Sequence, residues 1–129
     1  MNQAQSEQLA RRLAAIADSK KAEDPIVLGM RELVAYTDYL VICTARNERQ
    51  ARAIVDEVRV QVKRDAGLLP GGVDGGDEAG WIILDYLDCV LHVFTPEARE
   101  RYGLEDLWRD APRLELESDA PEASEAASA

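Results

Sequence analysis

The sequence predicts an α/β domain in which helices flank a mixed β-sheet of four to five strands, arranged as a sandwich. Two amphipathic stretches have helical spacing, and four apolar runs have the length and composition of strands. In chain order these elements read α-β-β-α-β-β-α, which favours a sheet packed against helices. The 129 residues suit one domain, expected over residues 1–112, followed by a disordered acidic tail over 113–129.

A first helix is expected to begin near Ser6, which is a good N-cap residue with Glu7 in the first turn. Leu9, Leu13 and Ile16 follow at helical spacing. One face of this helix should therefore pack against the sheet.

Two buried strands are expected next. Residues 26–28, Ile-Val-Leu, form a short apolar run after Pro25. Residues 39–43, Tyr-Leu-Val-Ile-Cys, are apolar at every position, as expected for a strand covered on both sides. The residues between them, 31–36, fit a turn or one helical turn.

The clearest helix spans about residues 48–66. Asn47 can cap its first turn, and Gln50 stands three residues later, as in a capping box. Apolar residues then recur on one face, and Gly67 supplies a stop signal.

The next segment, residues 70–76, is rich in glycine. It follows no strand and lacks the Lys-Ser/Thr pair of a phosphate-binding loop. A surface loop with a short edge strand near Val73 is the better interpretation.

Residues 81–86 and 89–94 are two strong strand patterns joined near Leu87 and Asp88, so they predict a β-hairpin. Thr95 and Pro96 then favour a helix start, and Gly103 a helix end. Residues 104–108 predict one further turn.

The net charge of −10 is unevenly distributed. Residues 110–129 hold six acids and one base, so half of the net charge lies in the tail. The mildly acidic body disfavours sequence-specific or general nucleic-acid binding and suits a basic protein partner. Because no run of 18 uncharged apolar residues and no secretory signal pattern is present, we expect a cytoplasmic protein without a membrane span.

Few side chains suggest catalysis or metal binding. Asp85 and Asp88 flank the hairpin turn and could hold Mg²⁺, but turn residues of this kind are common. His92 is the only histidine and is expected to be half-buried and hydrogen-bonded, with a role at an interface as the second interpretation. Cys43 and Cys89 predict two buried, reduced thiols rather than a disulfide or a metal site.

Several motifs, in this order and spacing, together resemble the Iojap family of ribosomal silencing factors over about residues 5 to 109. They are Lys21-Ala22-Glu23-Asp24 with Ile26-Val27-Leu28, Thr37-Asp38-Tyr39-Leu40-Val41-Ile42-Cys43, Arg49-Gln50, Gly80-Trp81-Ile82-Ile83-Leu84-Asp85-Tyr86, Asp88-Cys89-Val90-Leu91-His92-Val93-Phe94, and Arg99 through Tyr102 to Leu104-Glu105-Asp106-Leu107-Trp108. Two positions depart from the family pattern: Thr44-Ala45-Arg46 replaces a Ser/Gly or Thr/Gly pair, and Leu87 stands where glycine is common.

The resemblance implies a nucleotidyltransferase-like fold without that activity, and no cofactor or metal. It implies binding to ribosomal protein fourteen of the large subunit, which obstructs subunit association and represses translation. A homodimer is a possible assembly. By position, the implied partner-binding residues are Trp81, Ile82, Leu84, Asp85, Tyr86, His92, Arg99 and Tyr102, with Trp81 as the aromatic anchor.

Two other hypotheses stay open from the sequence. One is a nucleotidyltransferase-like enzyme that binds nucleotides through Asp85 and Asp88, although the chain lacks the expected phosphate loop. The other is an acidic adaptor whose tail, residues 113–129, makes the contacts.

Overall fold

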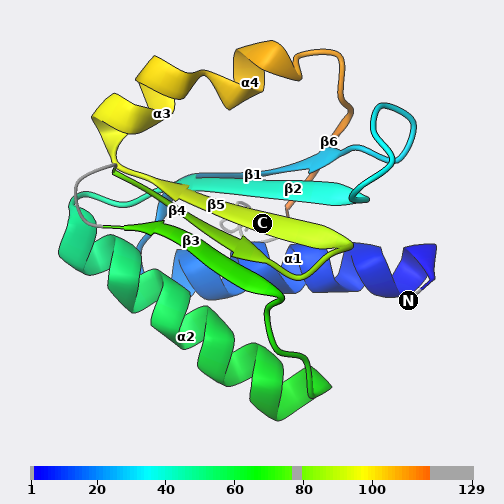
Figure 1. The fold of residues 1–129 in the computed structure, drawn as a ribbon, viewed down its shortest axis with the longest axis horizontal. Coiled ribbons are helices and arrows are strands. Elements are labelled where there is room, and N and C mark those ends of the chain that lie inside the picture. Colours follow the sequence, from blue (N-terminus) through cyan, green and yellow to red (C-terminus); the bar gives the residue numbers. More distant parts are fainter. Residues whose placement is uncertain (1, 77–79, 117–129) are drawn as a thin grey trace, which may run out of the picture.

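A six-stranded mixed sheet forms the centre of the protein (Figure 1). The computed structural model describes residues 2–76 and 80–116. Along the sheet the strand order is β3-β4-β5-β2-β1-β6, and only the β2–β5 pair is parallel. The strands are β1 (Glu23–Gly29), β2 (Tyr39–Thr44), β3 (Gly72–Gly76), β4 (Trp81–Asp85), β5 (Cys89–Phe94) and β6 (Arg113–Leu114). The predicted mixed α/β sandwich is confirmed, with six strands instead of four to five.

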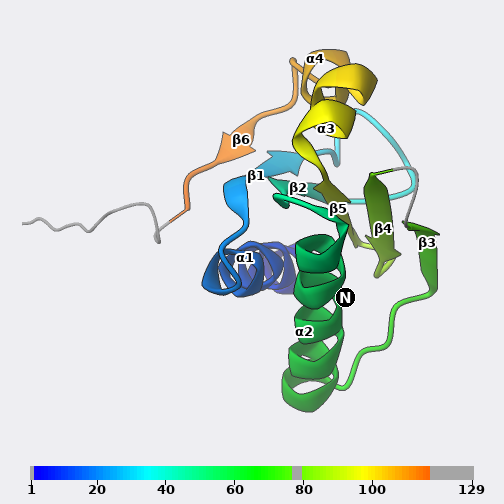
Figure 2. The same cartoon turned by 90° about the vertical axis from the view of Figure 1, so that its left-hand side faces the viewer.

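Helices cover the two faces of the sheet unequally. The long helices α1 (Gln3–Ser19) and α2 (Glu48–Ala66) pack on one face, and the short helices α3 (Pro96–Tyr102) and α4 (Leu104–Leu107) lie on the other (Figures 1 and 2). The larger hydrophobic cluster lies under α1 and α2. The smaller cluster lies under α3 and α4 and includes Leu28, Leu40, Ile42 and Ala98. Within the described residues, none of the helices combines the length and apolar character that crossing a membrane requires.

The first helix begins earlier than expected. Asn2 is its N-cap: its side chain accepts a hydrogen bond from the Gln5 amide at 2.9 Å, and the Gln5 side chain accepts one from the Asn2 amide at 2.9 Å. This reciprocal pair satisfies two amides that would otherwise lack partners. Ser6 therefore lies inside the helix, fully buried, and the predicted start near Ser6 is wrong.

The ends of α2 and α3 follow the sequence signals, except that the Gln50 side chain accepts a hydrogen bond from the Arg46 amide at 2.6 Å and not from Asn47, so the capping box is only half formed. The Asn47 side chain accepts a hydrogen bond from the Gln50 amide at 2.8 Å, and Gly67 ends α2 with a φ of +69°. Gly103 ends α3 with a φ of +56°. A left-handed residue lets the chain leave a helix while its amide still reaches the last turn, which glycine does without strain.

The expected tail begins inside the sheet. Arg113 and Leu114 form β6 and pair with Leu28 and Val27 of β1. Leu114 and Leu116 pack against the larger core cluster. The predicted boundary at residue 113 is therefore wrong, because a two-residue strand leaves no recognisable pattern. Residues 117–129 of the expected tail lie outside the described residues.

Candidate protein-binding face

Strand alternation divides the predicted contact residues of β4 between two faces of the sheet. Ile82, Leu84 and Tyr86 point toward α1 and α2 and are 7%, 0% and 5% exposed. Trp81, Ile83 and Asp85 point to the α3 side and are only partly buried. This corrects the predicted contact set. Ile82, Leu84 and Tyr86 belong to the core, whereas Ile83, which the prediction omitted, is partly accessible. The alternation of side chains along a strand could have predicted this, because it places Ile83 on the same face as Trp81 and Asp85.

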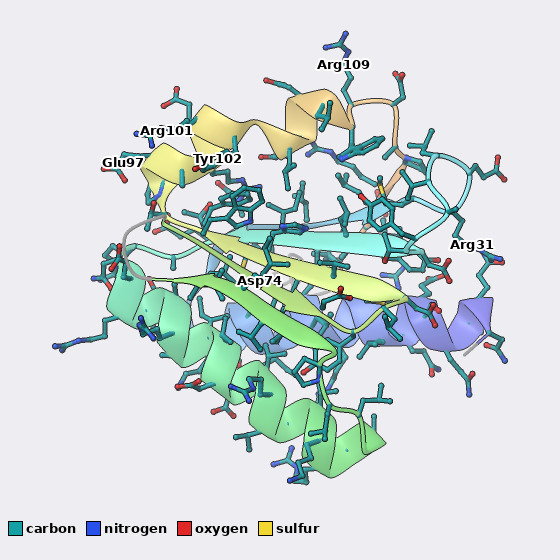
Figure 3. The ribbon with its side chains drawn as sticks, in the orientation of Figure 1. Arg31, Asp74, Glu97, Arg101, Tyr102 and Arg109 are labelled. Atoms are coloured by element: carbon teal, nitrogen blue, oxygen red, sulfur yellow. The ribbon has the colours of Figure 1, made fainter. Side chains whose placement is uncertain are left out.

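The α3 side of the sheet is only partly covered. In Figure 2 the α3–α4 segment lies over β1, β2 and β5, whereas β3 and β4 extend beyond it. Paired residues share a face, so Asp74 of β3 lies on the same side as Ile83. We call the residues of this uncovered area the open face: Asp74, Trp81, Ile83, Asp85 and Tyr102. Figure 3 shows Asp74 and Tyr102 at its two borders.

Aromatic rings form one end of the open face. The Trp81 ring centroid lies 4.9 Å from that of Phe94 and 4.5 Å from that of Tyr102. Phe94 is fully buried, while Tyr102 is 43% exposed. The indole thus contacts both a core residue and a surface residue, and joins β4 to α3. Contacts between rings at these distances add stability beyond the area they bury.

Gly80 allows the indole to reach this position. It has a φ of +68°, and a Cβ atom there would lie 2.5 Å from the Thr95 Oγ1 atom. The Thr95 amide also donates a hydrogen bond to the Gly80 carbonyl at 2.8 Å. A side chain at residue 80 would therefore push apart the start of β4 and the end of β5.

His92 on β5 accepts a hydrogen bond from the Trp81 indole. The Trp81 Nε1–H group donates a hydrogen bond to His92 Nδ1 at 3.0 Å. His92 is 8% exposed, and burial lowers the pKa of its imidazole to about 4, against the opposing effect of the Asp85 charge. The ring is therefore neutral at pH 7, with Nδ1 as acceptor. The predicted hydrogen-bonded histidine is confirmed, and it is more deeply buried than the half-buried position expected.

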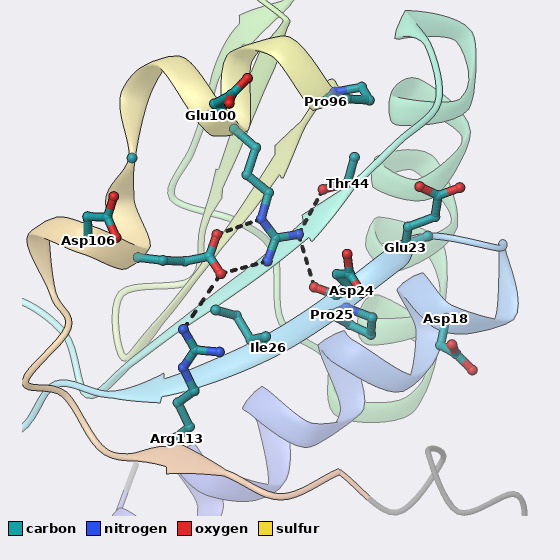
Figure 4. Close-up of a pocket in the computed structure, with 14 residues that line it drawn as sticks. Asp18, Glu23, Asp24, Pro25, Ile26, Thr44, Pro96, Glu100, Asp106 and Arg113 are labelled. Atoms are coloured by element: carbon teal, nitrogen blue, oxygen red, sulfur yellow. Dashed lines mark hydrogen bonds and ion pairs between the residues drawn. The ribbon is translucent and has the colours of Figure 1, made fainter.

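Arg99 lies away from the open face. Its guanidinium binds both carboxylate oxygens of Glu105 at 2.7 and 3.1 Å, and also donates to Thr44 Oγ1 and the Asp24 carbonyl (Figure 4). Hydrogen bonding from Arg99 lowers the pKa of the Glu105 carboxyl. Arg99 thus ties α3 and α4 to β1 and β2, and its side chain is only 13% exposed. Of the predicted contact residues, the structure brings Trp81, Asp85, His92 and Tyr102 together and leaves Arg99 apart.

The two hairpin aspartates do not form a shared site. Asp85 Oδ1 accepts a hydrogen bond from the Leu87 amide at 2.7 Å, which stabilises the turn. Leu87 has a φ of +73°, so it occupies the left-handed conformation that glycine prefers. Among the described residues, no three His, Cys, Asp or Glu side chains gather in a way that could hold a metal ion. These contacts give the nucleotide-binding alternative no support.

The two cysteines are free and buried, as predicted. Cys43 is fully buried in β2, and the Cys89 Sγ–H group donates to the Ser6 carbonyl at 3.1 Å. Burial raises the pKa of each thiol to about 12. Both groups therefore stay protonated at pH 7 and act as small core side chains.

The fold and the open face define a small α/β sandwich protein with an aromatic and acidic patch on one side of its sheet. The family model described as "Ribosomal silencing factor during starvation" matches residues 3–129. The ribosomal silencing factor RsfS of Bacillus subtilis is 38% identical over 104 residues, which are 81% of this chain and 87% of that protein. The chain belongs to the ribosomal silencing factor family.

A crystal structure and a eukaryotic relative extend this comparison. The crystal structure of a protein from Chromobacterium violaceum superposes with a TM-score of 0.74 at 26% identity, covering 91% of this chain and 93% of that one. A Mus musculus protein named mitochondrial assembly of ribosomal large subunit protein 1 is 29% identical over 101 residues, which are 74% of this chain and 43% of that protein.

Proposed function

We propose that this protein acts by binding rather than by catalysis. In this proposal the open face docks on the large ribosomal subunit at ribosomal protein fourteen. The bound protein then hinders joining of the small subunit and represses translation in the cytoplasm. Membership of the ribosomal silencing factor family supports this function, and the name of the mouse relative supports the large subunit as the partner.

The chemistry of the open face is the observation that carries the proposal. Trp81, Ile83 and Tyr102 offer accessible apolar and aromatic surface, and aromatic residues are enriched where protein partners bind most tightly. Asp74 and Asp85 add negative charge on the same side of the sheet. An aromatic patch with acidic neighbours suits a basic partner surface.

A subunit-joining assay with purified components tests the function. We expect saturating protein to reduce the formation of complete ribosomes from free subunits. Normal joining under saturation would contradict the proposal. Heat released on mixing with ATP and Mg²⁺ in calorimetry would favour the enzymatic alternative instead.

Co-sedimentation with large subunits tests the face. Trp81→Ala should weaken binding by roughly 2 kcal/mol or more, the usual threshold for an anchor residue. Val60→Ala is the matched control, since Val60 is 61% exposed on α2, on the opposite side of the sheet. Equal binding by both variants would rule out the open face. Deleting residues 117–129 should leave binding unchanged; loss of binding would favour the acidic-tail hypothesis.

A further inference from the structure

The hydrogen bond between Trp81 and His92 joins the open face to the core of the sheet. In the β4–β5 hairpin Trp81 is paired with Phe94, and Ile83 is paired with His92. Trp81 and His92 are therefore diagonal neighbours on the same face, within reach of long side chains. Their ring centroids are 5.8 Å apart, and Trp81 Nε1 lies 3.0 Å from His92 Nδ1.

The direction of this hydrogen bond is unambiguous. An indole N–H can only donate, so His92 Nδ1 must be the unprotonated acceptor. In the neutral ring the proton then lies on Nε2. The buried position of His92 favours the same neutral state, because burial disfavours the charged form.

We propose that His92 is a positioning residue of the binding face, which holds the Trp81 indole in one orientation by accepting its N–H. This inference rests on the proposed function of the open face. His92 itself is too buried to supply much contact area. It acts through Trp81, whose ring also packs against Phe94 and Tyr102.

The hydrogen bond also determines which groups of Trp81 remain available to a binding partner. Tryptophan at interfaces often donates its N–H to the partner. Here the N–H is directed to His92, so Trp81 offers ring surface and no free donor. The partner group that fits is an apolar or cationic side chain placed against the ring, rather than a hydrogen-bond acceptor. A fixed ring also loses less conformational entropy on binding than a mobile one.

Two variants separate this positioning role from bulk packing. His92→Phe keeps an aromatic ring but removes the acceptor, and leaves the indole N–H without its partner. His92→Asn places an amide oxygen near the position of Nδ1 and serves as the conservative variant. We expect His92→Phe to weaken large-subunit binding about tenfold, the usual scale for an unpaired polar group, and His92→Asn to restore most of the loss.

A readout without ribosomes keeps this test independent of the proposed function. In proton–nitrogen NMR spectra of the full chain, a Trp108→Phe variant assigns the two indole N–H signals. We expect the Trp81 signal to exchange with solvent about tenfold faster in His92→Phe than in the parent, and at an intermediate rate in His92→Asn. If Trp81→Ala leaves large-subunit binding intact, the open face is not the binding face. The exchange measurement would still test whether His92 holds the Trp81 indole.

Two results would overturn the inference. The first is a folded His92→Phe protein whose indole exchange and subunit binding both match the parent. The second needs no variant: nitrogen shifts of the native His92 ring should report a neutral ring protonated on Nε2. A proton on Nδ1 at pH 7 would exclude the hydrogen bond, even if every substitution at this position failed to fold.

Discussion

Arg99 and Glu105 form a two-pronged ion pair across the glycine turn that joins α3 to α4, with N–O distances of 2.7 and 3.1 Å. The same guanidinium reaches Thr44 and the Asp24 carbonyl, so one side chain connects the α3–α4 segment with two strands (Figure 4). The resemblance to the family placed Arg99 among the contact residues. Its partners in the structure indicate that it fixes the segment that carries Tyr102.

Arg99→Met should therefore destabilise the fold. Removing the cation leaves Glu105 half-buried with only the weaker Arg113 contact at 3.7 Å, which should cost roughly 2–4 kcal/mol of unfolding free energy. Urea denaturation measures the loss, and Arg101→Met, at an exposed position of the same helix, is the control. A variant that unfolds like the parent but no longer sediments with large subunits would make Arg99 a direct contact instead.

Neighbouring residues of β4 should respond in opposite ways. Leu84 is fully buried, so Leu84→Ala should lower stability by about 2–5 kcal/mol. Ile83→Ala should cost much less stability, because that side chain is partly exposed, and should weaken subunit binding. Denaturation and co-sedimentation of the two variants test which side of the strand meets the partner. Reduced binding by a folded Leu84→Ala protein, with Ile83→Ala unaffected, would reverse the assignment.

Stability should fall as the pH drops from 6.5 toward 4. In the unfolded chain His92 gains its proton near pH 6.5, whereas in the folded protein burial lowers its pKa to about 4. Between these values the unfolded state binds more protons, so acid favours unfolding, with a slope that approaches about 1.4 kcal/mol per pH unit. His92→Asn lacks this titration and should show a flatter profile in the same window. Parallel pH profiles for the two proteins would show that His92 does not titrate as stated.

The hairpin turn should tolerate glycine better than leucine. Leu87 adopts a φ of +73° and is 68% exposed, so its side chain adds backbone strain and little packing. Leu87→Gly should raise the unfolding free energy by up to about 1 kcal/mol, after the entropy cost of glycine is subtracted. Leu107 is 66% exposed but helical, so Leu107→Gly should destabilise the protein. Thermal unfolding compares the pair, and a lower midpoint for Leu87→Gly would contradict the strain argument.

Local signals in the sequence predicted most of the helices and strands. Asn47 and Gly67 mark the ends of α2, and Pro96 and Gly103 those of α3, because these residues act through their own backbone geometry and nearest turns. The misplaced start of α1 and the unpredicted strand β6 have a different origin. Ser6 and Asn2 are both acceptable caps, and Arg113–Leu114 becomes a strand only by pairing with β1.

The sequence by itself determined the family, the α/β class and the order of the elements as far as α4. The alternation of residues in β4 implied two faces, which the predicted contact set did not separate. Only the tertiary structure decided which of those faces meets solvent, since both are apolar and the answer depends on how far α3 and α4 extend over the sheet. It likewise assigned His92 to Trp81 and Arg99 to Glu105. The Trp81–His92 contact arises from strand register, which brings together residues whose local sequence carries no sign of one another. The Arg99–Glu105 pair depends on how the chain turns at Gly103 between α3 and α4.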